Sequence, residues 1–125
     1  MTLAAHAAQG RDIKLSENRV EGYRNFATKL WNAARFCEMN ECVYSTEFDP
    51  AGCKLAVNQW IVKKVSETVS QVEKGISEYR FNEAAGAIYQ FTWGTFCDWY
   101  LEFAKPIFQQ DDVAAASETR AAAAW

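Results

Sequence analysis

The spacing of apolar residues most constrains what this chain can fold into. Two stretches repeat apolar residues at steps of 3, 4, 3, 4 and 3. These stretches consist of Val20, Tyr23, Ala27, Leu30, Ala34 and Cys37, and of Val62, Val65, Val69, Val72, Ile76 and Tyr79. Such steps follow the 3.6-residue period of an α-helix, which outweighs the weak helix propensity of the valines. The spacing predicts two helices, each with its stripe in the core.

Turn and capping residues predict where the helices begin and end. Ser16 or Asn18 caps the first helix, and Asn40 ends it in the left-handed conformation. Asn82 caps a third helix that runs to the neighbourhood of Pro106. We expect a single all-α domain over residues 1–125, an antiparallel helical bundle truncated in its fourth helix. Its parts are a helix at about 17–39, a loop at 40–53, helices at about 55–79 and 82–105, and a partial helix at about 111–125.

The third predicted helix is apolar around nearly its whole circumference, which predicts that it is the central helix. Its aromatic residues therefore favour a core rather than a cofactor site; they include Trp93, Phe96, Trp99, Tyr100 and Phe103. Asp98 and Glu102 lie four residues apart with Lys105 close by. This arrangement favours an ion pair over a pair of catalytic carboxylates.

Composition excludes several classes of protein. Half of the 125 residues are apolar and 14% are aromatic, which is too much for an intrinsically disordered chain. No window approaches 18 consecutive apolar residues, and the N-terminus lacks the pattern of a signal peptide. We therefore expect a cytoplasmic protein that does not associate with a membrane. Neither end carries a clear helix stop or start, which leads us to expect a piece of a longer protein.

Histidine and cysteine limit the chemistry that is available. His6 is the one histidine, and the cysteines Cys37, Cys42, Cys53 and Cys97 form no Cys-x-x-Cys pair. This pattern favours reduced structural thiols over a zinc site or disulfides. Glycine-rich phosphate loops and hydrolase motifs are absent from the sequence. We therefore expect no catalytic residue, no metal site and no cofactor bound by this chain.

Charge is distributed unevenly along the chain. The formal net charge is −3, yet residues 11–35 hold six basic and three acidic residues, a local balance of +3. The basic residues are Arg11, Lys14, Arg19, Arg24, Lys29 and Arg35. A basic segment on an acidic body is typical of a localised site for an anionic partner. A solvated helix face with unbalanced charges fits the same numbers.

One face of the first predicted helix has the residue types that single-stranded RNA requires. On a helical wheel, Asn25, Lys29, Asn32 and Phe36 lie within about 60° of each other, opposite the predicted core stripe. Phe36 is therefore expected to be exposed, offering a ring for base stacking beside amides for base edges and an ammonium for phosphate. A second basic stripe adjoins it, made of Arg24, Thr28, Trp31 and Arg35. In the alternative interpretation, Phe36 packs on the following loop and the stripe faces water.

Several segments resemble one protein family. The string Phe-Cys-Asp-Trp-Tyr-Leu-Glu at 96–102, followed by Ala104-Lys105-Pro106, is the most specific. With the segments 10–15, 19–26, 29–36 and 79–86, it resembles the anticodon-binding domain of valyl-tRNA synthetases, which are class I aminoacyl-tRNA synthetases. The matches keep the family's order over about residues 2–125, interrupted by the 41–54 loop.

The resemblance implies recognition of the anticodon stem-loop of tRNA(Val), with no DNA partner. The catalytic domain of the same polypeptide, whose signature motifs do not occur here, would join valine to tRNA with ATP and Mg. The family places Lys29 and Phe36 at the anticodon loop. The full set of expected tRNA-binding residues is Arg19, Arg24, Asn25, Lys29, Asn32, Arg35 and Phe36. A structural or protein-interaction bundle without RNA specificity remains the alternative.

Overall fold

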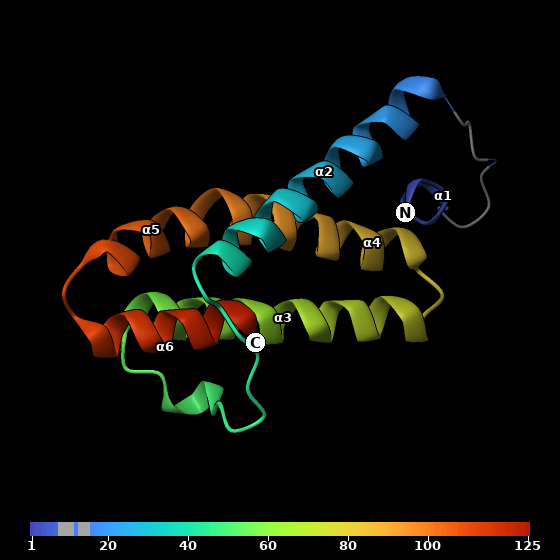
Figure 1. Cartoon of the computed structure of the whole chain (residues 1–125). Helices are drawn as coiled ribbons and strands as arrows, with labels where there is room; N and C mark the ends of the chain where they lie inside the picture. The colour runs from blue at the N-terminus through green and yellow to red at the C-terminus, as the bar shows by residue number, and fades with distance from the viewer. Residues whose placement is uncertain (8–11, 13–15) are drawn as a thin grey trace.

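The computed structural model of the chain describes residues 1–7, 12 and 16–125 (Figure 1). Over these residues it contains helices and no strand, so the predicted all-α class is confirmed. The elements are α1 (Thr2–His6), α2 (Glu17–Met39), the 3₁₀ helix η1 (Pro50–Gly52), α3 (Ala56–Ser77), α4 (Phe81–Tyr89), the π-helix η2 (Gln90–Tyr100), α5 (Leu101–Gln109) and α6 (Val113–Ala124). Arg11, Lys14 and most of segment 10–15 lie outside the described residues.

The helices form an antiparallel arrangement with one oblique member. α4, η2 and α5 join end to end, with right-handed helical backbone at both junctions, and run back along α3 (Figure 1). α6 then turns back and packs against both α5 and α3. α2 crosses this body obliquely; it packs against η2 and α6, and its aromatic side chains also reach α4 and α5. In the described part of the chain, no helix combines the length and apolar character that a membrane span needs.

α2 ends at Asn40 as predicted, but the conformation of this cap, the start of α4 and the end of α5 differ from the prediction. Asn40 is not left-handed: Glu41 takes that conformation, with φ of 60°, while the Asn40 side chain donates to Phe36 O at 2.8 Å. α4 begins at Phe81 without an Asn82 cap, and α5 continues beyond Pro106 to Gln109. Proline removes a single backbone hydrogen bond, and the half-buried residues Ile107 and Phe108 beyond it still favour the helix.

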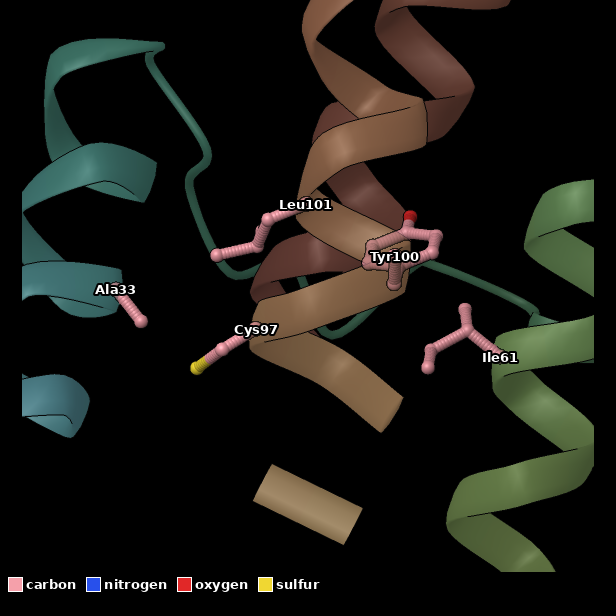
Figure 2. Packing of buried hydrophobic residues seen from close by; sticks show 5 residues of the cluster. All are labelled: Ala33, Ile61, Cys97, Tyr100 and Leu101. Carbon is pink, nitrogen blue, oxygen red and sulfur yellow. The ribbon is translucent and has the colours of Figure 1, made fainter. Parts of the chain in front are cut away.

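The apolar core lies where α2, η2 and α3 meet. Its buried cluster consists of Ala33, Ile61, Cys97, Tyr100 and Leu101 (Figure 2). In Figure 2, Ala33 of α2 and Cys97 of η2 point toward one another, and Ile61 of α3 faces Tyr100. η2 is therefore the helix on which the other two converge, as its apolar sequence predicts.

The aromatic residues of this central helix are not all buried, contrary to the prediction. Trp99 is 59% exposed and Phe103 is 47% exposed, and their rings lie 5.9 Å apart on the surface. The π-helical turn explains part of the difference, because i→i+5 hydrogen bonds such as Leu101 N–H to Phe96 O change the angle between successive side chains. A wheel drawn for an α-helix therefore assigns faces incorrectly across 90–100.

A buried polar cluster ties α3, η2 and α6 together. Asn58, fully buried, accepts from the Tyr100 hydroxyl at 2.9 Å and donates to Thr119 Oγ1 at 3.1 Å and Glu118 Oε1 at 2.9 Å. Glu118 of α6 also accepts from the backbone N–H groups of Lys54 and Leu55, each at 2.9 Å. Because α3 has no cap from its own side chains, Glu118 satisfies donors at its N-terminus from another helix.

Glu118 gives folding a dependence on pH. Burial raises the pKa of its carboxyl, yet the hydrogen bonds from Asn58, Leu55 and Lys54 together bring this pKa below its usual 4.5. A carboxyl with a lowered folded-state pKa stabilises the fold above about pH 4.5, and this contribution is lost as pH falls through the folded-state pKa. The free energy of unfolding should decrease as the pH falls from about 7 to about 3, and we expect this decrease to be smaller in Glu118→Gln. Urea titrations across this pH range measure it. Glu73→Gln, at an exposed site on α3, is the control; equal slopes for both variants would contradict the assignment.

A close contact between α3 and α4 leaves little room for a side chain at Gly75. A Cβ at Gly75 would lie 3.0 Å from Ala84 N and 3.1 Å from Ala84 Cβ. We expect Gly75→Ala to lower the free energy of unfolding by about 1–3 kcal/mol through overpacking. Gly22→Ala in α2, where no atom lies within 4 Å, is expected to raise it by up to about 1 kcal/mol. Denaturant titrations that give both variants the same sign would refute this interpretation.

Candidate nucleic-acid interface

A groove separates α2 from η2 and α5 and holds three of the expected tRNA-binding residues. It encloses about 280 Å³ and is lined by Lys29, Asn32, Ala33 and Phe36 of α2, and by Cys97, Leu101, Glu102 and Lys105 of η2 and α5. We call it the α2–α5 groove. Ala33, Cys97 and Leu101 are part of the buried core, so the floor of the groove is apolar while its rims are polar.

Lys29 is held in place across the groove. Its ammonium donates to Asp98 Oδ1 at 2.7 Å and lies 5.3 Å from the centre of the Trp93 ring. The Asp98 hydrogen bond raises the pKa of Lys29 above its usual value, and burial opposes this only in part. The side chain keeps 34% of its exposure, so a charged ammonium in a fixed position remains accessible at the rim.

Phe36 lies at the groove rather than freely in solvent, so the expectation of an exposed ring is wrong. It is half-buried against the core cluster, with its ring centre 6.2 Å from that of Phe108. The Lys105 ammonium lies 5.9 Å from the Phe36 ring centre. Packing against α5, and not against the loop after α2, therefore covers part of the ring and leaves its groove side available.

The buried face of α2 is not the predicted stripe. Phe26 and Ala33 are buried, whereas Val20 is 46% and Leu30 is 50% exposed, and Ala34 is exposed as well. The true core face is turned toward the side of the helix that carries Lys29 and Phe36. This rotation is the physical reason that both residues contact η2 and α5 instead of projecting into solvent.

The remaining expected residues lie on the exposed surface of α2. Arg24 pairs with Glu21 at 2.9 Å, both side chains being more than half exposed. The others, Arg19, Asn25 and Arg35, are exposed, and Asn32 is exposed at the rim of the α2–α5 groove. The structure thus brings Lys29, Asn32 and Phe36 together and spreads the arginines along the same helix.

Sequence reasoning missed the part of the groove that η2 and α5 supply. The sequence pattern indicates only that three of its residues are neighbours on one helix: Asp98, Glu102 and Lys105. The predicted ion pair is confirmed for Lys105 and Glu102, at 2.6 Å, but Asp98 pairs instead with Lys29, which is 69 residues away in the sequence. Spacing within one helix carries no signal for a partner on another.

The described residues contain no grouping of three or more His, Cys, Asp or Glu side chains that could hold a metal ion. The four cysteines are free thiols. The lysines at the groove are paired with carboxylates, Lys29 with Asp98 and Lys105 with Glu102, so the groove presents hydrogen-bond donors and acceptors to a polar ligand.

Comparisons with known proteins identify the family of the chain. Residues 58–125 match the anticodon-binding domain of tRNA ligases. Over 124 residues, 99% of the chain, it is 58% identical to a valine–tRNA ligase of Nitrobacter winogradskyi, 57% identical to one of Caulobacter vibrioides and 55% identical to one of Bartonella henselae. The chain spans 13–14% of the length of these relatives. No solved structure matches the chain. The chain therefore belongs to the family of anticodon-binding domains of tRNA ligases, and the three relatives compared above are valine–tRNA ligases.

Proposed function

We propose that this chain recognises the anticodon loop of tRNA(Val) as part of a valine–tRNA ligase, and that the α2–α5 groove receives the anticodon bases. The observation that carries the proposal is the convergence of Lys29, Asn32 and Phe36 on one groove in a chain of this family. The polypeptide that contains the chain would join valine to tRNA in the cytoplasm, using ATP and Mg in a separate catalytic domain.

The groove offers the contacts that unstacked bases require. The accessible side of the Phe36 ring provides a stacking surface, and the Asn32 amide can both donate to and accept from base edges. Glu102 can accept a hydrogen bond from an exocyclic amino group, while Lys29 and Lys105 can donate to base carbonyls. The paired carboxylates disfavour phosphates in the groove, which therefore suits bases.

The outer surface of α2 would hold the RNA backbone. Arg19, Arg24, Asn25 and Arg35 are exposed along this helix beside the groove. The Arg24–Glu21 pair is exposed, and such surface pairs contribute little, so Arg24 can exchange its carboxylate for a phosphate. Phosphate contacts would supply much of the affinity and make it salt-dependent.

A chemical-shift titration of the labelled chain tests this function. The ligands are a valine-specific anticodon stem-loop and the same stem-loop with a changed anticodon, each at low and moderate salt. We expect shifts clustered on Asn25, Lys29, Asn32 and Phe36 that weaken with the changed anticodon and with added salt. Absent shifts, or equal shifts for both stem-loops, would contradict recognition by the groove.

The same titration addresses a protein-interaction role. An apolar hollow of about 480 Å³ lies on the other side of α2, and Leu30, Ala34, Val43 and Tyr44 are among its lining residues. Binding of a protein there would be insensitive to salt and would leave the groove signals unshifted. RNA-induced shifts that are confined to the α2–α5 groove would therefore favour RNA recognition over a protein-interaction role.

A further inference from the structure

The C-terminus of α2 brings two cysteines into contact. Cys42 N–H donates to Cys37 O at 3.0 Å and Glu41 N–H donates to Glu38 O at 3.1 Å, with Glu41 in the left-handed region. These two bonds define a Schellman motif, in which side chains at the positions of Cys37 and Cys42 frequently contact one another. Apolar residues usually occupy both positions, whereas here both are thiols.

The two neighbouring thiols have unequal acidity, and the Cys42 Sγ lies 4.0 Å from Asn40 O. The hydrogen bond from Cys37 lowers the pKa of the Cys42 thiol below its usual 9.0; burial opposes this, and the nearby Arg120 guanidinium contributes to the lowering. The same hydrogen bond raises the pKa of Cys37, and burial raises it further. Arg120 is fixed beside Cys42, because its Nε donates to Asn40 O at 2.8 Å.

This pair is more exposed to small molecules than the other two cysteines. Cys37 and Cys42 are both half-exposed and line the open hollow of about 480 Å³ beside α2. Cys53 is 5% and Cys97 is 6% exposed, and burial raises the pKa of both thiols. Reactivity of a cysteine requires access together with a population of thiolate, and the chain combines these at Cys42.

We propose that Cys37 and Cys42 form a peroxide-reactive dithiol that closes to an intrachain disulfide at the C-terminus of α2. The Cys42 thiolate attacks one oxygen of hydrogen peroxide, the O–O bond breaks, and hydroxide leaves and is protonated to water, which gives a sulfenic acid. The Cys37 sulfur attacks the Cys42 sulfur, the S–O bond breaks, and the leaving hydroxide takes the Cys37 proton as water. Two thiols are thereby oxidised to a disulfide while one peroxide is reduced to two waters.

This dithiol is separate from the groove yet adjacent to it. Cys37 follows Phe36 directly and packs against the same core cluster. The backbone hydrogen bond between Cys42 N–H and Cys37 O already holds the two residues next to each other, so closure would proceed by rotation of their side chains.

Alkylation kinetics and peptide mapping of the peroxide-treated chain test the proposal. We expect iodoacetamide to modify Cys42 at least about tenfold faster than Cys53 or Cys97 near neutral pH. After treatment with hydrogen peroxide, we expect one disulfide-linked species, lighter by two hydrogens, with Cys37 joined to Cys42, and dithiothreitol to reverse it. Equal alkylation of the four cysteines, or a linkage that involves Cys53 or Cys97, would overturn the proposal.

Single substitutions assign the roles of the two thiols. In Cys37→Ser, we expect peroxide to leave a sulfenic acid on Cys42 that dimedone traps, whereas Cys42→Ser should prevent both dimedone labelling and the disulfide. Cys53→Ser is the matched control and should leave the linkage unchanged. Dimedone labelling that persists in Cys42→Ser would assign the attack to another thiol and contradict the mechanism. These readouts require no RNA, so they stand or fall independently of the proposed tRNA recognition.

Discussion

Asn58→Ala is expected to lower the free energy of unfolding by about 3–5 kcal/mol. Asn58 is fully buried, accepts from the Tyr100 hydroxyl and donates to Glu118 and Thr119. Truncation removes three hydrogen bonds at once and leaves the Tyr100 hydroxyl with the longer contact to Thr119 O, at 3.3 Å. It also leaves a cavity at the junction of α3, η2 and α6. Urea titration followed by far-ultraviolet circular dichroism measures the change.

Asn18→Ala is the matched control for this experiment. Asn18 lies exposed in the first turn of α2, so the same atoms are removed without opening a buried site. We expect a change within about 0.5 kcal/mol, as for ordinary surface substitutions. If Asn58→Ala destabilised the chain no more than Asn18→Ala, the buried polar cluster would not hold α3, η2 and α6 together.

Phe36→Ala is expected to weaken binding of the valine-specific anticodon stem-loop by about 5- to 150-fold. The range corresponds to about 1–3 kcal/mol for the loss of base stacking on one aromatic ring. Phe36 lines the α2–α5 groove, and its packing against Phe108 and Lys105 fixes the ring before RNA arrives. Fluorescence anisotropy with a labelled stem-loop measures the affinity, with circular dichroism to verify that the variant is folded.

Phe103→Ala distinguishes stacking in the groove from a general loss of aromatic surface. Phe103 is 47% exposed on α5, contacts Trp99 and is not among the residues that line the groove. We expect its removal to change RNA affinity less than twofold. Equal losses for both variants, or none for Phe36→Ala, would remove Phe36 from the proposed recognition site.

Local sequence patterns predicted the helical class and the residue types of the candidate interface. The apolar period identified helices where α2 and α3 occur, and the wheel grouped Lys29, Asn32 and Phe36, which the structure places in one groove. The ion pair of Glu102 with Lys105 could also be predicted from the sequence, because the two residues lie three positions apart on one helix. Each of these features depends on neighbours within about one helical turn.

Only the tertiary structure decided which face of α2 is buried. The helix carries two adjacent apolar stripes, one through Leu30 and Ala34 and one through Phe26 and Ala33, and either fits a wheel. Contact with η2 selected the second stripe and placed Lys29 against Asp98. The sequence alone determined the periods and the charges, since these act over a few residues. Which stripe is buried depends on contact with a helix that lies far away in the sequence, and no local pattern specifies that contact.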